Sequence, residues 1–88
     1  LLGLMFRPSL RPGEGLWIEP CSAVHTHFMR FPIDVAFVDR KGYVLSVIPG
    51  MKPWRFSPVF PEAAAVLELP SGALGDTAVG DRIALCPD

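Results

Sequence analysis

The sequence predicts a small all-β domain, either an antiparallel sandwich or a barrel-like fold, with at most one or two short helical turns. Ten prolines and eight glycines among 88 residues interrupt the chain too often for a long helix. The stretches between these breaks are short and rich in β-branched and aromatic residues, which is typical of strands. Half of the residues are hydrophobic, enough for one core, so we expect residues 1–88 to form a single domain.

Several short runs fit this pattern, and the clearest of them form a hairpin. The runs 33–39 and 43–48 flank a turn that Asp39 opens and in which Gly42 can adopt a left-handed conformation. Both faces of the first run are apolar, which predicts a central strand covered on two sides. Pro49 and Gly50 are expected to end the second strand. The predicted strands are 16–18, 23–28, 33–38, 43–48, 64–69 and 82–86.

The region 51–61 is predicted to be an irregular loop and the candidate rim of a binding cleft. We expect its aromatic side chains Trp54, Phe56 and Phe60 to pin it to the body of the domain. Two short helical turns are also expected, one at 62–65 and one at 1–6. The predicted core is drawn from the strands and includes Val35, Phe37, Leu45, Val47, Val66, Leu67 and Leu69.

Charge and hydropathy exclude two classes of partner. Eight basic and nine acidic residues are scattered along the chain without a basic stripe, so we expect no nucleic-acid binding. No apolar run approaches the roughly 18 residues of a spanning helix, so we expect no integral membrane association. Residues 1–6 lack an initiator Met and look like the interior of a longer chain. We therefore expect a missing upstream segment, and both a cytoplasmic and an exported location stay open.

The densest group of reactive side chains lies at 21–30. On a regular strand Cys21, His25 and His27 would share one face, and a His-x-His pair with a thiol could bind zinc or copper. No second ligand pair with metal-site spacing occurs, so no cofactor is expected, with zinc or copper as the alternative. Cys21 and His25 would lie about 13 Å apart on a strand, too far for thiol activation. Whether Cys21 and Cys86 form a disulfide stays open.

A third group of residues fits recognition better than catalysis. An arginine beside an exposed aromatic side chain can bind a carboxylate or phosphate group, or stack on a ring. We therefore expect a concavity bordered by His25 and Arg30 and rimmed by Trp54-Arg55. The candidate ligand-binding residues are His25, Thr26, Arg30, Asp34, Trp54 and Arg55.

Five separated motifs, taken in order, resemble the domain of unknown function family 192. They are Gly3-Leu4-Met5-Phe6-Arg7, a turn at 10–15 into 16–18, the run 32–39 followed by Gly42, the run 66–72, and Gly80-Asp81. Residues 21–34 resemble a branch of that family with the signature Cys-x-x-Val-His-Thr-x-x-Met-Arg-Phe-Pro-Ile-Asp. His27 falls at a variable position of this signature. The resemblance implies a compact β-rich sandwich with no established activity.

Two functional hypotheses from different classes follow. The favoured one is a small non-catalytic binding module that uses the surroundings of His25, Arg30 and Trp54. Its ligand would be a small anionic molecule, a peptide or protein partner, or a glycan. The alternative is a metal-dependent or thiol enzyme centred on Cys21 and His25. The binding module is favoured because an enzyme needs a nucleophile, a base and a stabilising group within mutual reach, and the sequence secures no such set.

Overall fold

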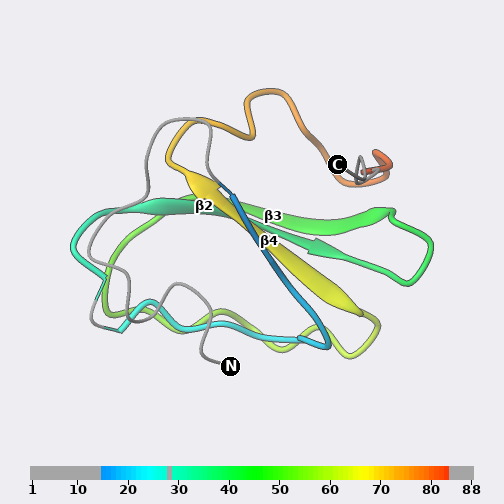
Figure 1. Ribbon diagram of the computed structural model, residues 1–88, viewed down its shortest axis with the longest axis horizontal. Coiled ribbons are helices and arrows are strands. Elements are labelled where there is room, and N and C mark those ends of the chain that lie inside the picture. The colour runs from blue at the N-terminus through cyan, green and yellow to red at the C-terminus, as the bar shows by residue number, and fades with distance from the viewer. Residues whose placement is uncertain (1–14, 28, 84–88) are drawn as a thin grey trace.

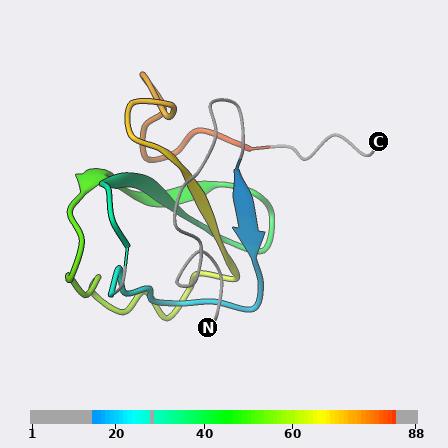
Figure 2. The ribbon, with the colours of Figure 1, turned by 60° about the vertical axis from the view of Figure 1, so that its left-hand side comes forward.

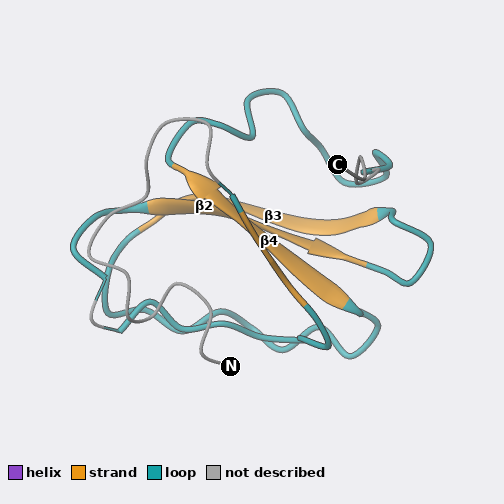
Figure 3. Ribbon diagram, in the orientation of Figure 1, coloured by secondary structure: helices purple, strands orange, loops and turns teal. Residues whose placement is uncertain are grey.

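Four antiparallel strands form one sheet in the computed structural model, which describes residues 15–27 and 29–83 (Figure 1). The strands are β1 (Leu16–Ile18), β2 (Ile33–Val38), β3 (Val44–Met51) and β4 (Ala65–Pro70), and their order in the sheet is β1-β4-β2-β3. The described residues contain no helix, as the colouring in Figure 3 shows. The predicted all-β class is confirmed.

The predicted hairpin is confirmed as β2 and β3. Ala36 lies opposite Val47 in the antiparallel register. In the connecting turn an Asp39 carboxylate oxygen accepts hydrogen bonds from the backbone N–H groups of Lys41 and Tyr43, both at 2.9 Å. β2 lies between β3 and β4, and all six of its residues are buried. It is therefore the central strand that its two apolar faces predict.

The prediction that Pro49 and Gly50 end the second strand is wrong, because β3 continues to Met51. Met51 lies opposite Ile33, and the register shifts between that pair and the next one. β3 is at the edge of the sheet that the described residues form, and edge strands are where proline is tolerated. Gly50 adopts a φ of 57°, which suits this irregular place in the strand.

Residues 21–27 and 52–60 run side by side away from the sheet, and we call them the second layer (Figures 1 and 2). The expected strand 23–28 is wrong, because the described residues 23–27 form only an isolated bridge, between His25 and Phe56. Two hydrogen bonds make this segment irregular. The Val24 N–H donates to the Ser57 hydroxyl, and the Met29 N–H donates to the Thr26 carbonyl and turns the chain.

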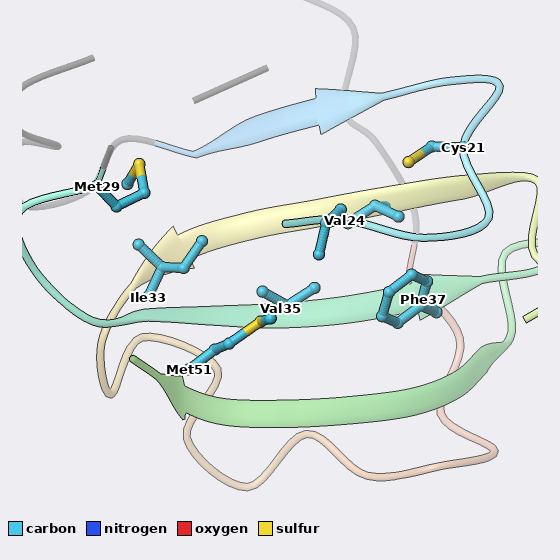
Figure 4. Packing of buried hydrophobic residues seen from close by; sticks show 8 residues of the cluster. Cys21, Val24, Met29, Ile33, Val35, Phe37 and Met51 are labelled. Carbon is cyan, nitrogen blue, oxygen red and sulfur yellow. The ribbon is translucent and has the colours of Figure 1, made fainter. Parts of the chain in front are cut away.

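The hydrophobic core fills the space between the sheet and the second layer (Figure 4). Val35, Phe37 and Val66 are fully buried there, as predicted. The other predicted core residues, Leu45, Val47, Leu67 and Leu69, are only half-buried. Val47, Leu67 and Leu69 lie on the other face of the sheet, because they pair with Ala36 or Asp34 in the neighbouring strand. The second layer does not cover that face. The core also takes side chains from the second layer and its continuation, namely Cys21, Val24 and Met29.

The loop aromatics behave differently from one another. Phe60 packs against Phe37 with ring centroids 4.4 Å apart, as expected. Trp54 and Phe56 do not pin the loop, because 54% and 75% of their surfaces are exposed. The chain turns at 61–62 before β4, but the helical turn expected at 62–65 does not form, because β4 already begins at Ala65. The expected helical turn at 1–6 and most of the expected strand 82–86 lie outside the described residues, and Arg82 forms an isolated bridge with Tyr43.

Candidate functional site

Thr26 joins the two halves of the second layer. Its side chain is fully buried, and its hydroxyl donates to the Lys52 carbonyl at 2.6 Å and accepts from the Arg55 N–H at 2.9 Å. Its backbone N–H donates to the Arg55 carbonyl, and its carbonyl accepts from the Trp54 N–H. Thr26 therefore fixes residues 52–55 from inside the fold, and its hydroxyl is used by that network.

His25 and His27 flank Thr26 and lie on the outward side of the second layer. Val24 and Thr26 are buried whereas both histidines are half-buried, so residues 24–27 alternate as an extended segment does. The two imidazole rings meet edge to face with centroids 4.9 Å apart. His27 also contacts Phe56 at 4.6 Å and Trp54 at 5.1 Å between centroids. We call His25, His27, Trp54 and Phe56 the aromatic surface.

Trp54 has an unusual backbone conformation, with a φ of 63°. Non-glycine residues seldom adopt this left-handed region, and doing so costs about 1–3 kcal/mol unless the surroundings enforce it. Here the hydrogen bond from the Trp54 N–H to the Thr26 carbonyl and the three hydrogen bonds between Arg55 and Thr26 enforce it. The strained backbone holds a large and half-exposed indole beside His27.

Positive charge accompanies the aromatic surface. Arg30, Lys52 and Arg55 have exposed side chains, and the ranges 20–33 and 51–61 contain no aspartate or glutamate. One guanidinium nitrogen of Arg55 lies 3.4 Å from the Trp54 carbonyl oxygen, to which it donates. The two segments that build this part of the molecule thus carry three cations without a neutralising carboxylate, although the whole chain has a net charge of −1.

Asp34 lies on the opposite face of the sheet from the second layer. Its carboxylate is buried and accepts hydrogen bonds from three backbone N–H groups, those of Gly50 at 2.8 Å, Gly72 at 2.9 Å and Leu74 at 3.1 Å. It ties the end of β3 to the loop after β4, beneath an open hollow of about 480 Å³. The structure therefore separates Asp34 from the histidines with which the sequence groups it.

Cys21 points into the core, on the inner side of the second layer (Figure 4). Its thiol donates to the Ala23 carbonyl at 3.1 Å, and burial raises its pKa above the ordinary value. The regular strand that would place Cys21 and His25 on one face does not form, because 21–23 is irregular. Cys21 is buried like Val24, whereas His25 lies outward. The expected shared face is therefore wrong at Cys21.

The two histidines remain as a pair without a third ligand in the described part of the chain. There, no group of three or more His, Cys, Asp or Glu side chains is arranged to hold a metal ion. The Nδ1 atoms of His25 and His27 are both buried and have no hydrogen-bond partner among the described residues. Residues 15–27 and 29–83 contain no helix that is long and apolar enough to cross a membrane.

The structure brings His25, Thr26, Trp54 and Arg55 together, and it adds two residues that sequence reasoning did not select, Lys52 and Phe56. Arg30 follows the turn between Thr26 and Met29 and is exposed. The absence of acidic residues from 51–61 could have identified Lys52 as an unneutralised cation of the site. No comparable signal marks Phe56, because an apolar loop residue is more often buried than exposed.

Two solved structures are similar to this chain. A protein of unknown function from Novosphingobium aromaticivorans shares 26% identity at a TM-score of 0.78, and the alignment covers 91% of this chain and 63% of the other. A Sinorhizobium meliloti protein described as a proposed transcription regulator shares 24% identity at a TM-score of 0.74, covering 91% and 68%. The second likeness shows the fold alone. This chain spans less than two thirds of the first protein's length.

A search among curated proteins found no match. The model of the family DUF192, described as Uncharacterized ACR, matches residues 1–85, which is nearly the whole sequence. The match agrees with the resemblance that the five sequence motifs carry. The chain therefore belongs to the DUF192 family.

Proposed function

We propose that this domain is a non-catalytic binding module that holds a small organic anion on the aromatic surface. The observation that carries the proposal is the combination of half-exposed Trp54 and largely exposed Phe56 with Lys52 and Arg55 in one segment free of carboxylates. A flat apolar group of the ligand would lie on the rings, and its negative charge would face the cations. Aromatic side chains and arginine are the residues most enriched where ligands and partners bind.

The exposure of Trp54 and Phe56 supports a binding role over a purely structural one. Large aromatic side chains gain most when they leave water, so two neighbouring exposed rings retain unused hydrophobic free energy. The Thr26 hydrogen bonds order the backbone of 52–55 before any ligand arrives. Affinity rises when the ordering cost is met during folding, so this arrangement favours binding.

The position of Cys21 supports binding over thiol catalysis. Its sulfur is buried, its hydrogen bond goes to Ala23, and its raised pKa disfavours the reactive thiolate. A catalytic thiol needs a base within hydrogen-bond reach, and the nearest histidine in sequence, His25, lies on the outer side of the second layer. The enzyme alternative would therefore require the second layer to rearrange.

The proposal is tested by following the backbone and imidazole resonances by NMR during titration with four small molecules. Benzoate combines a ring with a carboxylate, acetate lacks the ring, benzylamine reverses the charge, and zinc chloride probes the metal alternative. We expect saturable shifts at His25, His27 and the Trp54 indole with benzoate, weaker effects with acetate, and none with benzylamine. Absence of saturable shifts with benzoate up to about 10 mM, a binding free energy weaker than roughly 3 kcal/mol, would overturn the proposal.

Matched variants locate the binding. Arg55→Gln removes one charged donor and is expected to weaken benzoate binding about 5- to 10-fold, while Phe56→Ala removes ring contact and should weaken it similarly. Arg40→Gln makes the same charge change at an exposed arginine in the β2–β3 turn and should leave binding unchanged. Equal losses in Arg55→Gln and Arg40→Gln would show that only the net charge of the protein matters.

A further inference from the structure

We infer that the neutral imidazoles of His25 and His27 both carry their proton on Nε2, so that the aromatic surface offers N–H donors to a carboxylate and disfavours a divalent metal ion. The inference deepens the proposed function, and its ligand half rests on that proposal. It concerns which ring nitrogen is protonated, a property of the free protein that can be measured without any ligand.

The buried Nδ1 atoms indicate which ring nitrogen carries the proton. Neither Nδ1 atom, in His25 or His27, has a hydrogen-bond partner among the described residues. A neutral imidazole has one nitrogen that donates and one that accepts. A buried N–H group without an acceptor is rarer in proteins than a buried acceptor without a donor. The proton is therefore better placed on Nε2, which leaves only a lone pair buried at Nδ1.

Both rings are partly exposed, which bears on what their Nε2–H groups can bind. Each histidine is half-buried, and Nδ1 belongs to the buried part of each ring, whereas Nε2 is not among the buried atoms without a partner. The ring centroids of His25 and His27 are 4.9 Å apart. A carboxylate group has two oxygens that each accept hydrogen bonds, so two neighbouring rings protonated on Nε2 would match it with two donors.

The same tautomer opposes metal binding. A metal ion binds the lone pair of a histidine nitrogen, and the Nδ1 lone pairs here are buried. Binding through Nε2 would move the proton to Nδ1 and leave one buried unpaired N–H on each ring. Each such group is expected to lower metal affinity about tenfold or more, and the described residues supply no third ligand to compensate.

Long-range proton–nitrogen correlation spectra of the nitrogen-15-labelled protein test the tautomers directly. The bare and protonated nitrogens of a neutral ring resonate far apart, so the spectrum identifies the protonated one. We expect the proton on Nε2 in both His25 and His27. A proton on Nδ1 of either ring would overturn the inference, yet benzoate binding could still uphold the proposed function.

A matched pair of substitutions tests the donor role. In His27→Gln the amide nitrogen lies near the position of Nε2 and can donate there, whereas in His27→Asn it lies near Nδ1. Benzoate affinity should fall less than about 3-fold in the glutamine variant and about 10-fold in the asparagine variant, as loss of a donor predicts. Equal losses in the two variants would overturn the donor role of His27.

Two further outcomes separate the inference from the function. The protein could carry the proton on Nε2 of both rings and still bind no benzoate. That result would refute the proposed function and the expected binding of a carboxylate, and it would leave the tautomers established. Saturable zinc binding at micromolar concentration that is lost in both His25→Gln and His27→Gln would overturn the preference for a carboxylate over a metal ion.

Discussion

Replacing Thr26 by valine keeps the shape of the side chain but removes the hydroxyl that ties residues 52–55 to residues 21–27. The hydroxyl makes two short hydrogen bonds, to Lys52 and from Arg55, and the valine leaves both backbone groups without that partner. Each lost bond costs about 1 kcal/mol, and a buried group left unpaired costs more. Because both bonds are only partly buried, we expect a total loss of about 2–3 kcal/mol. Urea unfolding followed by tryptophan fluorescence measures it.

Thr26→Ser provides the matched control, because it keeps the hydroxyl and loses one methyl group. A buried methyl group is worth about 1 kcal/mol, so the serine variant should unfold at a higher urea concentration than the valine variant. Amide hydrogen exchange should also become faster at Arg55 in the valine variant and change little in the serine variant. A valine variant as stable as the serine variant would refute the role assigned to the hydroxyl.

Three other substitutions test the fold. Asp34→Ala removes the acceptor of three backbone hydrogen bonds and should cost about 3–5 kcal/mol in urea unfolding, with faster hydrogen exchange at Gly72; slow exchange there would contradict the assigned bond. Phe37→Ala leaves a cavity in the core and should also cost about 3–5 kcal/mol, so an unchanged midpoint would contradict its burial. The variant Cys86→Ser leaves Cys21 as the one thiol of the chain. At pH values just above 9.0 the Cys21 thiol stays protonated in the folded protein, because its pKa is raised, but it is deprotonated in the unfolded protein. Stability should therefore fall as pH rises above the ordinary thiol value of 9.0, by at most about 1.4 kcal/mol per pH unit, and Cys21→Ala should lack this component.

The sheet was largely predictable because its strands obey local rules. β2 has two apolar faces, β1 directly follows Gly15 and β4 ends at Pro70, so the sequence pattern and the structure agree at these strands. The end of β3 could not be predicted from Pro49 and Gly50 alone. Whether a proline ends a strand depends on whether that strand lies at the edge or in the interior of the sheet, and the order of the strands decides this.

The candidate site was predictable in residues but not in arrangement. The alternation at 24–27 places His25 and His27 outward as a strand would, but the turn at Met29 ends that regularity. Thr26 and Asp34 are both candidate ligand-binding residues, yet the side chain of each forms its hydrogen bonds with backbone groups of distant segments. Those partners are separated by 16 residues or more, so no local pattern reveals them.

The pairing of the first strand with the last has a consequence for synthesis. Leu16 of β1 lies opposite Glu68 of β4, and among the described residues β4 is the one strand that pairs with β1, so this pairing cannot form until β4 has been made. Glu68 follows Leu16 by 52 positions, so at roughly 5–20 residues per second it is added roughly 3–10 s later. The β2–β3 hairpin can form meanwhile from neighbouring residues, whereas Leu16 and Ile18 wait with their apolar side chains uncovered by the sheet. A nascent chain stalled before residue 65 would therefore present a hairpin and an unpaired apolar segment, which is the kind of surface that chaperones bind.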